Sequence, residues 1–132
     1  MTDSFGQTDI GCTTVTVIST IAIGIDIYPN RTPNPVFLSR NYTLYVAVLG
    51  SSNFDVTTLN SATVKFGKTG TEASPMRAPI IRDLNGDGFL DAMYGFRTFD
   101  CGFVLGDTTG LLKGKLNNGT DAEGNDSVLV SP

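Results

Sequence analysis

The sequence predicts an all-β protein, an Ig-like or jelly-roll-like β-sandwich of seven to eight strands with a protruding N-terminal strand. Three observations predict it. The chain of 132 residues contains 15 glycines and many Thr and Val residues, and it lacks long Leu/Ala/Glu/Lys-rich stretches. Apolar residues alternate with polar ones in several short runs, and Gly, Pro, Asn and Asp separate these runs. The hydrophobic share of 40% is enough for one folded core.

The longest alternating run lies near the N-terminus, and its apolar positions are Val15, Val17, Ile21, Ile23, Ile25 and Ile27. Fully extended, it would measure roughly 40 Å at about 3.3 Å per residue, which is about twice the length of a typical sandwich strand. Either the chain bends between residues 19 and 24 and forms two strands, or the first half pairs outside its own domain. We therefore divide the chain into an extension, residues 1–20, and a sandwich domain, residues 21–132.

The remaining elements follow in order. Three prolines in residues 29–41 predict a loop with at most one edge segment. Residues 43–50 read as a core strand. Residues 51–61 read as a helical turn capped by Asp55, with Phe54, Val56 and Leu59 facing inward. Further strands are expected at residues 61–67, 78–83, 89–98, 103–107, 111–116 and 127–130.

The segment DLNGDGFLD, residues 83–91, predicts a calcium-binding loop. Side-chain oxygens recur at relative positions 1, 3, 5 and 9, and position 7 offers a main-chain carbonyl; Ca²⁺ takes six to eight such oxygens. The expected ligands are Asp83, Asn85, Asp87, Asp91 and the carbonyl of Phe89. Gly88 supplies the sharp turn, and Leu90 is expected to point into the core. The alternative is an ordinary polar turn, since Asn-Gly and Asp-Gly are common hairpin signals.

The match to an EF-hand is incomplete, because relative position 12 is Tyr94 instead of a bidentate Glu. The flanking segments are then free to be strands. This shorter spacing resembles the loops of dockerins and of FG-GAP-type repeats, and the resemblance implies that calcium has a structural role here.

Several function classes lack their residues. The chain has no histidine, which excludes Ser-His-Asp and Cys-His catalysis and ordinary zinc hydrolase sites. Its net charge is −4 and its basic residues are scattered, so nucleic acid is not an expected partner. No apolar run is long enough to span a membrane. We do not expect an enzyme.

Two further features fit an extracellular protein. Cys12 and Cys101 form an even pair, which predicts one disulfide within or between subunits, with two buried thiols as the alternative. Four Asn-x-Ser/Thr sequons predict exposed sites at which glycans would be attached. They lie at Asn30, Asn41, Asn118 and Asn125.

From about residue 25 to residue 130 the chain resembles a domain of secreted proteins from environmental bacteria. The segments that carry the resemblance are IDIYPN (25–30), VAVLGSSNFDVTTLNSATVKFG (46–67), GTEASP (70–75), RDLNGDGFLDAMYGFRT (82–98), CGFVLGDTTGLLKG (101–114) and DAEGNDSV (121–128). Members of that family have a more basic opening and a histidine before the acidic loop. Tyr28 and residues 77–80 depart from that pattern.

The extension lies outside the shared unit and contains the surplus alternating strand. This arrangement resembles the subunits of extracellular bacterial fibres, in which each N-terminal strand completes the sheet of the next subunit. The resemblance implies a head-to-tail homopolymer with Val15, Val17, Ile18 and Ile21 as the donated side chains.

We therefore expect a structural subunit of an extracellular or cell-surface filament stabilised by Ca²⁺. The alternative is a monomeric calcium-stabilised module for carbohydrate binding or adhesion. Its binding platform would use the aromatic residues Tyr42, Tyr45, Tyr94 and Phe96.

Overall fold

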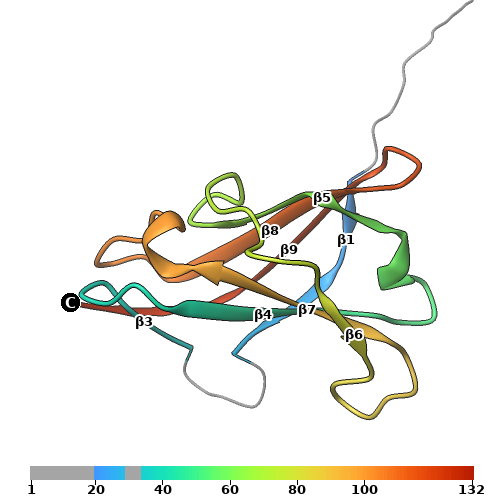
Figure 1. Ribbon diagram of the computed structural model, residues 1–132, viewed down its shortest axis with the longest axis horizontal. Coiled ribbons are helices and arrows are strands. Elements are labelled where there is room, and N and C mark those ends of the chain that lie inside the picture. The colour runs from blue at the N-terminus through green and yellow to red at the C-terminus, as the bar shows by residue number, and fades with distance from the viewer. Residues whose placement is uncertain (1–19, 29–33) are drawn as a thin grey trace, which may run out of the picture.

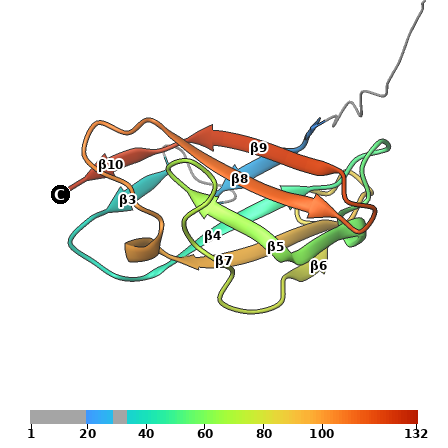
Figure 2. The same ribbon diagram turned by 90° about the horizontal axis from the view of Figure 1, so that it is seen from above.

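Two four-stranded sheets face each other in the computed structural model, which describes residues 20–28 and 34–132 (Figures 1 and 2). Two single-turn 3₁₀ helices, η1 (Val56–Thr58) and η2 (Thr98–Asp100), lie in the connections. The strands are β1 (Ile21–Ala22), β2 (Gly24–Ile27), β3 (Pro35–Phe37), β4 (Thr43–Leu49), β5 (Leu59–Gly67), β6 (Ile80–Arg82), β7 (Asp91–Arg97), β8 (Thr109–Leu116), β9 (Asp121–Ser127) and β10 (Leu129–Ser131).

One sheet has the strand order β1-β9-β8-β5 and the other has the order β2-β4-β7-β6. A small parallel pair, β3 with β10, lies at the end of the molecule that carries the C-terminus (Figure 1). The predicted all-β sandwich is confirmed. The described part has more strands than predicted because several of them are only two to four residues long.

The long alternating run divides between the two sheets. Ile21 pairs in parallel with Ala122 of β9, and the amide of Ile23 donates to the Glu123 carbonyl at 2.9 Å. The chain then crosses over, and β2 pairs antiparallel with β4. Gly124 permits this crossing, since a Cβ there would lie 2.7 Å from the Ile23 carbonyl oxygen. The described half of the run therefore forms two short strands that meet at Ile23, and its first half, residues 15–19, lies outside the described residues.

This crossing uses one residue of the predicted donor strand within its own domain. Ile21, which we expected to be donated, pairs within its own chain and packs against the core of its own domain. The other three expected donor residues, Val15, Val17 and Ile18, lie outside the described residues.

The core fills the space between the sheets. Phe66 of β5 packs against Phe96 of β7 with ring centroids 5.2 Å apart, and against Phe103 at 5.9 Å. Tyr94 is buried beside them, and its hydroxyl lies 3.0 Å from the Ser61 hydroxyl. Phe54, Val56 and Leu59 are buried as predicted, and Asp55 caps η1 by accepting a hydrogen bond from the Thr57 amide at 2.9 Å.

Two sequence-based assignments of strands differ from the structure. Residues 103–107 form a turn instead of a strand, in which the Val104 amide donates to the Asp107 carboxylate and Val104 and Leu105 are exposed. Strand β9 was not predicted before residue 127, because the residues that it buries are only Ala122 and Gly124. Small buried side chains leave no apolar alternation to recognise.

Cys101 is a free thiol within the described residues and is fully buried, with its Sγ donating to the Arg97 carbonyl at 3.3 Å. Burial raises the pKa of this thiol to about 12. Its predicted disulfide partner, Cys12, lies outside the described residues. Of the sequons, Asn41, Asn118 and Asn125 are exposed as predicted, and Asn30 also lies outside.

In the part of the chain that the structure describes, no helix has the length and apolar character needed to cross a membrane.

Candidate metal centre

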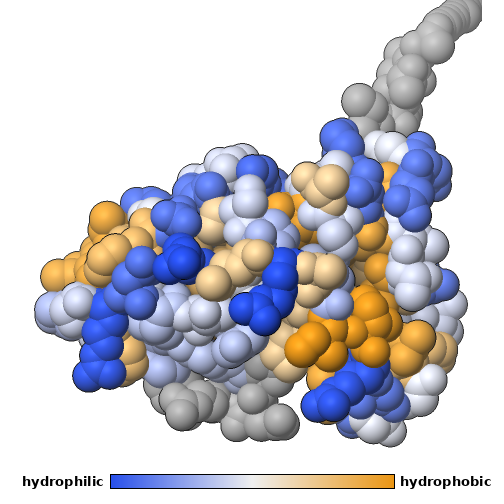
Figure 3. Space-filling model, in the orientation of Figure 1, coloured by the Kyte–Doolittle hydropathy of each residue, from blue (hydrophilic) through white to orange (hydrophobic). Residues whose placement is uncertain are grey.

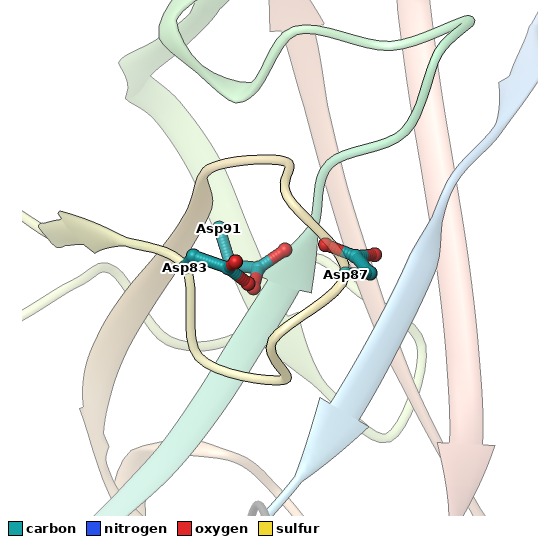
Figure 4. Close-up of side chains that lie close together, drawn as sticks. All are labelled: Asp83, Asp87 and Asp91. Carbon is teal, nitrogen blue, oxygen red and sulfur yellow. The ribbon is translucent and has the colours of Figure 1, made fainter.

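The loop between β6 and β7 gathers three carboxylates. Asp83, Asp87 and Asp91 each offer an oxygen, and these three oxygens lie within 4.8 Å of one another. Figure 4 shows the Asp83 and Asp91 carboxylates together within the loop and Asp87 on its opposite side. Residues that are four and eight positions apart meet here because the loop closes on itself before β7 begins.

Two glycines produce that closure. Gly86 and Gly88 have φ angles of +76° and +88°, which L side chains rarely adopt. Their amides turn inward, and both donate to the Asp83 carboxylate at 2.9 Å. Shorter turns follow, in which Asn85 accepts from the Asp87 amide at 3.3 Å and Asp87 accepts from the Phe89 amide at 2.9 Å. Asp83, Asn85 and Asp87 therefore each hold the backbone that follows them in the chain.

Asp91 anchors the loop to the sandwich. It is the first residue of β7, its exposed fraction is 0%, and both of its carboxylate oxygens accept hydrogen bonds. Oδ1 accepts from the Gly50 amide at the end of β4, and Oδ2 accepts from the Leu84 amide, both at 2.8 Å. Gly50 must be a glycine here, because a Cβ would collide with the Leu90 carbonyl oxygen.

The electrostatics favour a cation. Three carboxylates at this separation repel one another, and none of the ion pairs among the described residues involves any of them. The amide of Gly88, donating to Asp83, holds the pKa of that carboxyl below its ordinary value, so Asp83 is ionised and ready to bind. A set of hard oxygen donors fits Ca²⁺ or a similar divalent ion, and it does not fit soft metals.

The structure brings together three of the five predicted ligands, Asp83, Asp87 and Asp91. Asn85 lies in the same loop with its Oδ1 directed to the Asp87 amide, and coordination by the Phe89 carbonyl stays a prediction. The expectation that Leu90 enters the core is wrong, because Leu90 is 50% exposed. The buried residues that follow the loop are Asp91 and Ala92 of β7.

The departure from an EF-hand has a structural reason. Once β7 begins at Asp91, side chains alternate between the two faces of the sheet, and Tyr94 at relative position 12 is directed into the core. The flanking elements are the strands β6 and β7, as the sequence analysis expected.

Sequence reasoning missed the contribution of Gly50 and Leu84. Their amides hold the buried Asp91 carboxylate, and Gly50 comes from a strand 41 residues away. The signal in the sequence was the glycine that directly follows the apolar run of residues 43–49.

A cation in this loop would connect the end of β6 with the start of β7 and, through Asp91, with β4. Such a cross-link would join three strands of one sheet. No protein-family model matches the chain, and a comparison with curated proteins finds no match.

Proposed function

We propose that this chain is a structural subunit of an extracellular or cell-surface filament, assembled head to tail by donation of its N-terminal strand and stabilised by Ca²⁺. One observation carries the proposal. Among the described residues, the alternating N-terminal run enters the sandwich at β1, where Ile21 and Ala22 pair with β9, and β2 follows directly. The two strands account for the run from Ile21 to Ile27, and the proposal assigns the preceding alternation, with Val15 and Val17, to a neighbouring subunit.

The physical cost of leaving that run unpartnered supports assembly. The sequence from residue 10 to residue 25 has no charge and no proline, and β-branched side chains are frequent in it. An exposed strand of this kind is a template for pairing with another chain. Burial of about four such side chains at roughly 1.5–3 kcal/mol each would make a junction that rarely dissociates.

Calcium has a defined part in this proposal. The ion would fasten the β6–β7 connection and, through Asp91, the end of β4. A filament subunit outside the cell has steady access to millimolar calcium, a concentration at which even weak extracellular sites fill. Disulfide bonding of Cys12 to Cys101 and glycans on the exposed sequons remain further predictions of the same proposal.

Most of the aromatic side chains that the carbohydrate-binding alternative requires are not exposed. Of the four aromatic residues considered for it, Tyr94 and Phe96 are buried in the core. The Tyr42 hydroxyl is engaged by the Phe37 amide and the Pro35 carbonyl, which leaves Tyr45, 47% exposed, as the one open ring of the four. Sugar platforms depend on several stacked faces.

Electron microscopy of the purified protein tests the proposal. The full chain in calcium should form filaments, whereas a variant that lacks residues 1–19 should stay monomeric with its calcium-dependent melting intact. The variant retains every described core residue, since the core begins at Ile21 and Ile23. Filaments formed equally well without residues 1–19 would refute strand donation, and a monomeric full chain would favour the single-module alternative.

A further inference from the structure

We infer that the outer edge of β6, together with the hydrophobic pocket beside it, receives the N-terminal strand of the next subunit. This receiving surface consists of β6 (Ile80–Arg82) and the pocket residues Tyr45, Met76, Arg77 and Met93. The inference deepens the proposed function and rests on it, because it commits to residues 12–19 of a second copy as the occupant.

The first observation is an open strand edge. β6 is the last strand of the order β2-β4-β7-β6, and among the described residues no strand pairs with its outer side. All three of its residues are exposed, including Ile80 at 55% and Ile81 at 39%. Figure 3 shows a hydrophobic patch over β6. An open edge with apolar β-branched side chains is the form that strand addition uses.

The second observation is the adjoining pocket. It lies on the outer face of the sheet between β4, β7 and the segment before β6, and it has a volume of about 90 Å³. That volume exceeds the roughly 10–15 Å³ that one water requires and is below the about 150 Å³ cavity that accepts benzene. A valine-sized side chain fits such a space. Val15 and Val17, two residues apart, would present their side chains on one face of a donated strand.

The segment that precedes the proposed occupant carries the opposite charge to the receiving surface. Residues 1–19 contain two acidic residues, Asp3 and Asp9, and no basic residue. The receiving segment contains Arg77 and Arg82, and no acidic residue occurs from 73 to 82. The amide of Met76 also donates to the Gly95 carbonyl of β7, which holds the segment before β6 against the same sheet.

Another candidate surface is a groove of about 360 Å³ beside β3 and η2, lined by residues that include Phe37, Phe99 and Phe103. It lacks a free backbone edge. One side of β3 pairs with β10, and the Tyr42 hydroxyl engages the Phe37 amide and the Pro35 carbonyl. The opposite edge of the sheet is closed as well, since the Asp126 carboxylate accepts from the Ile27 amide at 3.0 Å.

A matched pair of variants tests the inference in the full-length protein. Ile80→Lys places a charge at the receiving edge, and Leu105→Lys places the same charge on the exposed turn of residues 103–107 at nearly equal exposure, 55% against 58%. Calcium-dependent melting should be preserved in both variants, because both side chains face solvent. In calcium, Ile80→Lys should lose at least tenfold in pelletable filament, whereas Leu105→Lys should assemble like the unmodified chain.

Disulfide trapping supplies a second measurement. In a Cys12→Ser background, chains with Val17→Cys are mixed with chains with Ile80→Cys and oxidised in calcium. Dimers that contain one chain of each kind support the inference. Dimers formed by the Ile80→Cys chains alone would instead indicate symmetric β6–β6 pairing and would overturn it.

These experiments distinguish failure of filament assembly from failure of the β6 edge as the receiving surface. If the unmodified chain forms no filaments, the proposed function fails and the inference falls with it. If filaments form and Ile80→Lys assembles normally, or if Leu105→Lys alone blocks assembly, only the choice of the β6 edge is refuted.

Discussion

Asp91 and Asp87 belong to the same carboxylate cluster, yet their loss should have different consequences. Asp91 is fully buried and accepts two backbone hydrogen bonds, whereas Asp87 is exposed and accepts one, from within the loop. Asp91→Ala should therefore destabilise the protein even without metal. Asp87→Ala should affect mainly the calcium-bound form.

The magnitudes follow from those contacts. A hydrogen bond to a charged group contributes about 1.5–3 kcal/mol, and water entering the new space would satisfy part of what is lost. Asp91→Ala in chelator should thus lower the unfolding free energy by about 2–4 kcal/mol, or the melting temperature by roughly 8–16 °C for a domain of this size. Calcium binding adds a separate contribution to the unfolding free energy, which is about 2.7 kcal/mol when free calcium exceeds Kd one-hundredfold.

Differential scanning calorimetry in calcium and in chelator measures both parts. The matched control is Asp121→Ala, which removes an equal charge from an exposed ion pair with Lys115. Asp87→Ala should lose the calcium-dependent rise in melting temperature and match the unmodified chain in chelator. The reasoning is refuted if Asp91→Ala and Asp87→Ala melt together in chelator, or if Asp87→Ala still gains stability from calcium.

Three further outcomes are expected. Gly50→Ala should lower the unfolding free energy by about 1–3 kcal/mol and weaken calcium binding, because the new Cβ would displace the Leu90 carbonyl. Calorimetric titration with calcium measures the affinity, and an affinity equal to that of the unmodified chain would contradict the prediction. In a Cys12→Ser background, Cys101 should resist a thiol reagent at pH 8 until the protein unfolds, and rapid labelling of the native protein would contradict its burial. The folded pKa of Cys101, about 12, lies above its ordinary value of 9.0, so its contribution to stability is complete below pH 9 and declines above it, by up to about 1.4 kcal/mol per pH unit. Between pH 8 and pH 10.5, the unfolding free energy of the Cys12→Ser variant, measured with denaturant, should fall more than that of the variant that also carries Cys101→Ala. Equal decreases in the two variants would refute the raised pKa of Cys101.

The sequence alone predicted the fold class and the carboxylate cluster, because both depend on local spacing. Alternation with a period of two identifies strands, and Gly86 and Gly88 between regularly spaced oxygens identify a loop that closes on itself and gathers those oxygens. Asp83, Asp87 and Asp91 could be named for this reason, since nine consecutive residues contain the whole pattern.

Only the tertiary structure decided which residues from distant strands complete these features. The amide of Gly50 reaches Asp91 because β4 and β7 are neighbours in one sheet, and no spacing along the chain encodes that contact. Leu90 is exposed and Ile21 pairs within its own domain for the same kind of reason: the burial of an apolar residue depends on the strands that surround it. Strand β9 remained hidden in the sequence because it packs through Ala122 and Gly124, whose small side chains leave room for the crossing at Ile23. Local periodicity therefore identifies a strand, and close packing between strands decides its partner and its edge.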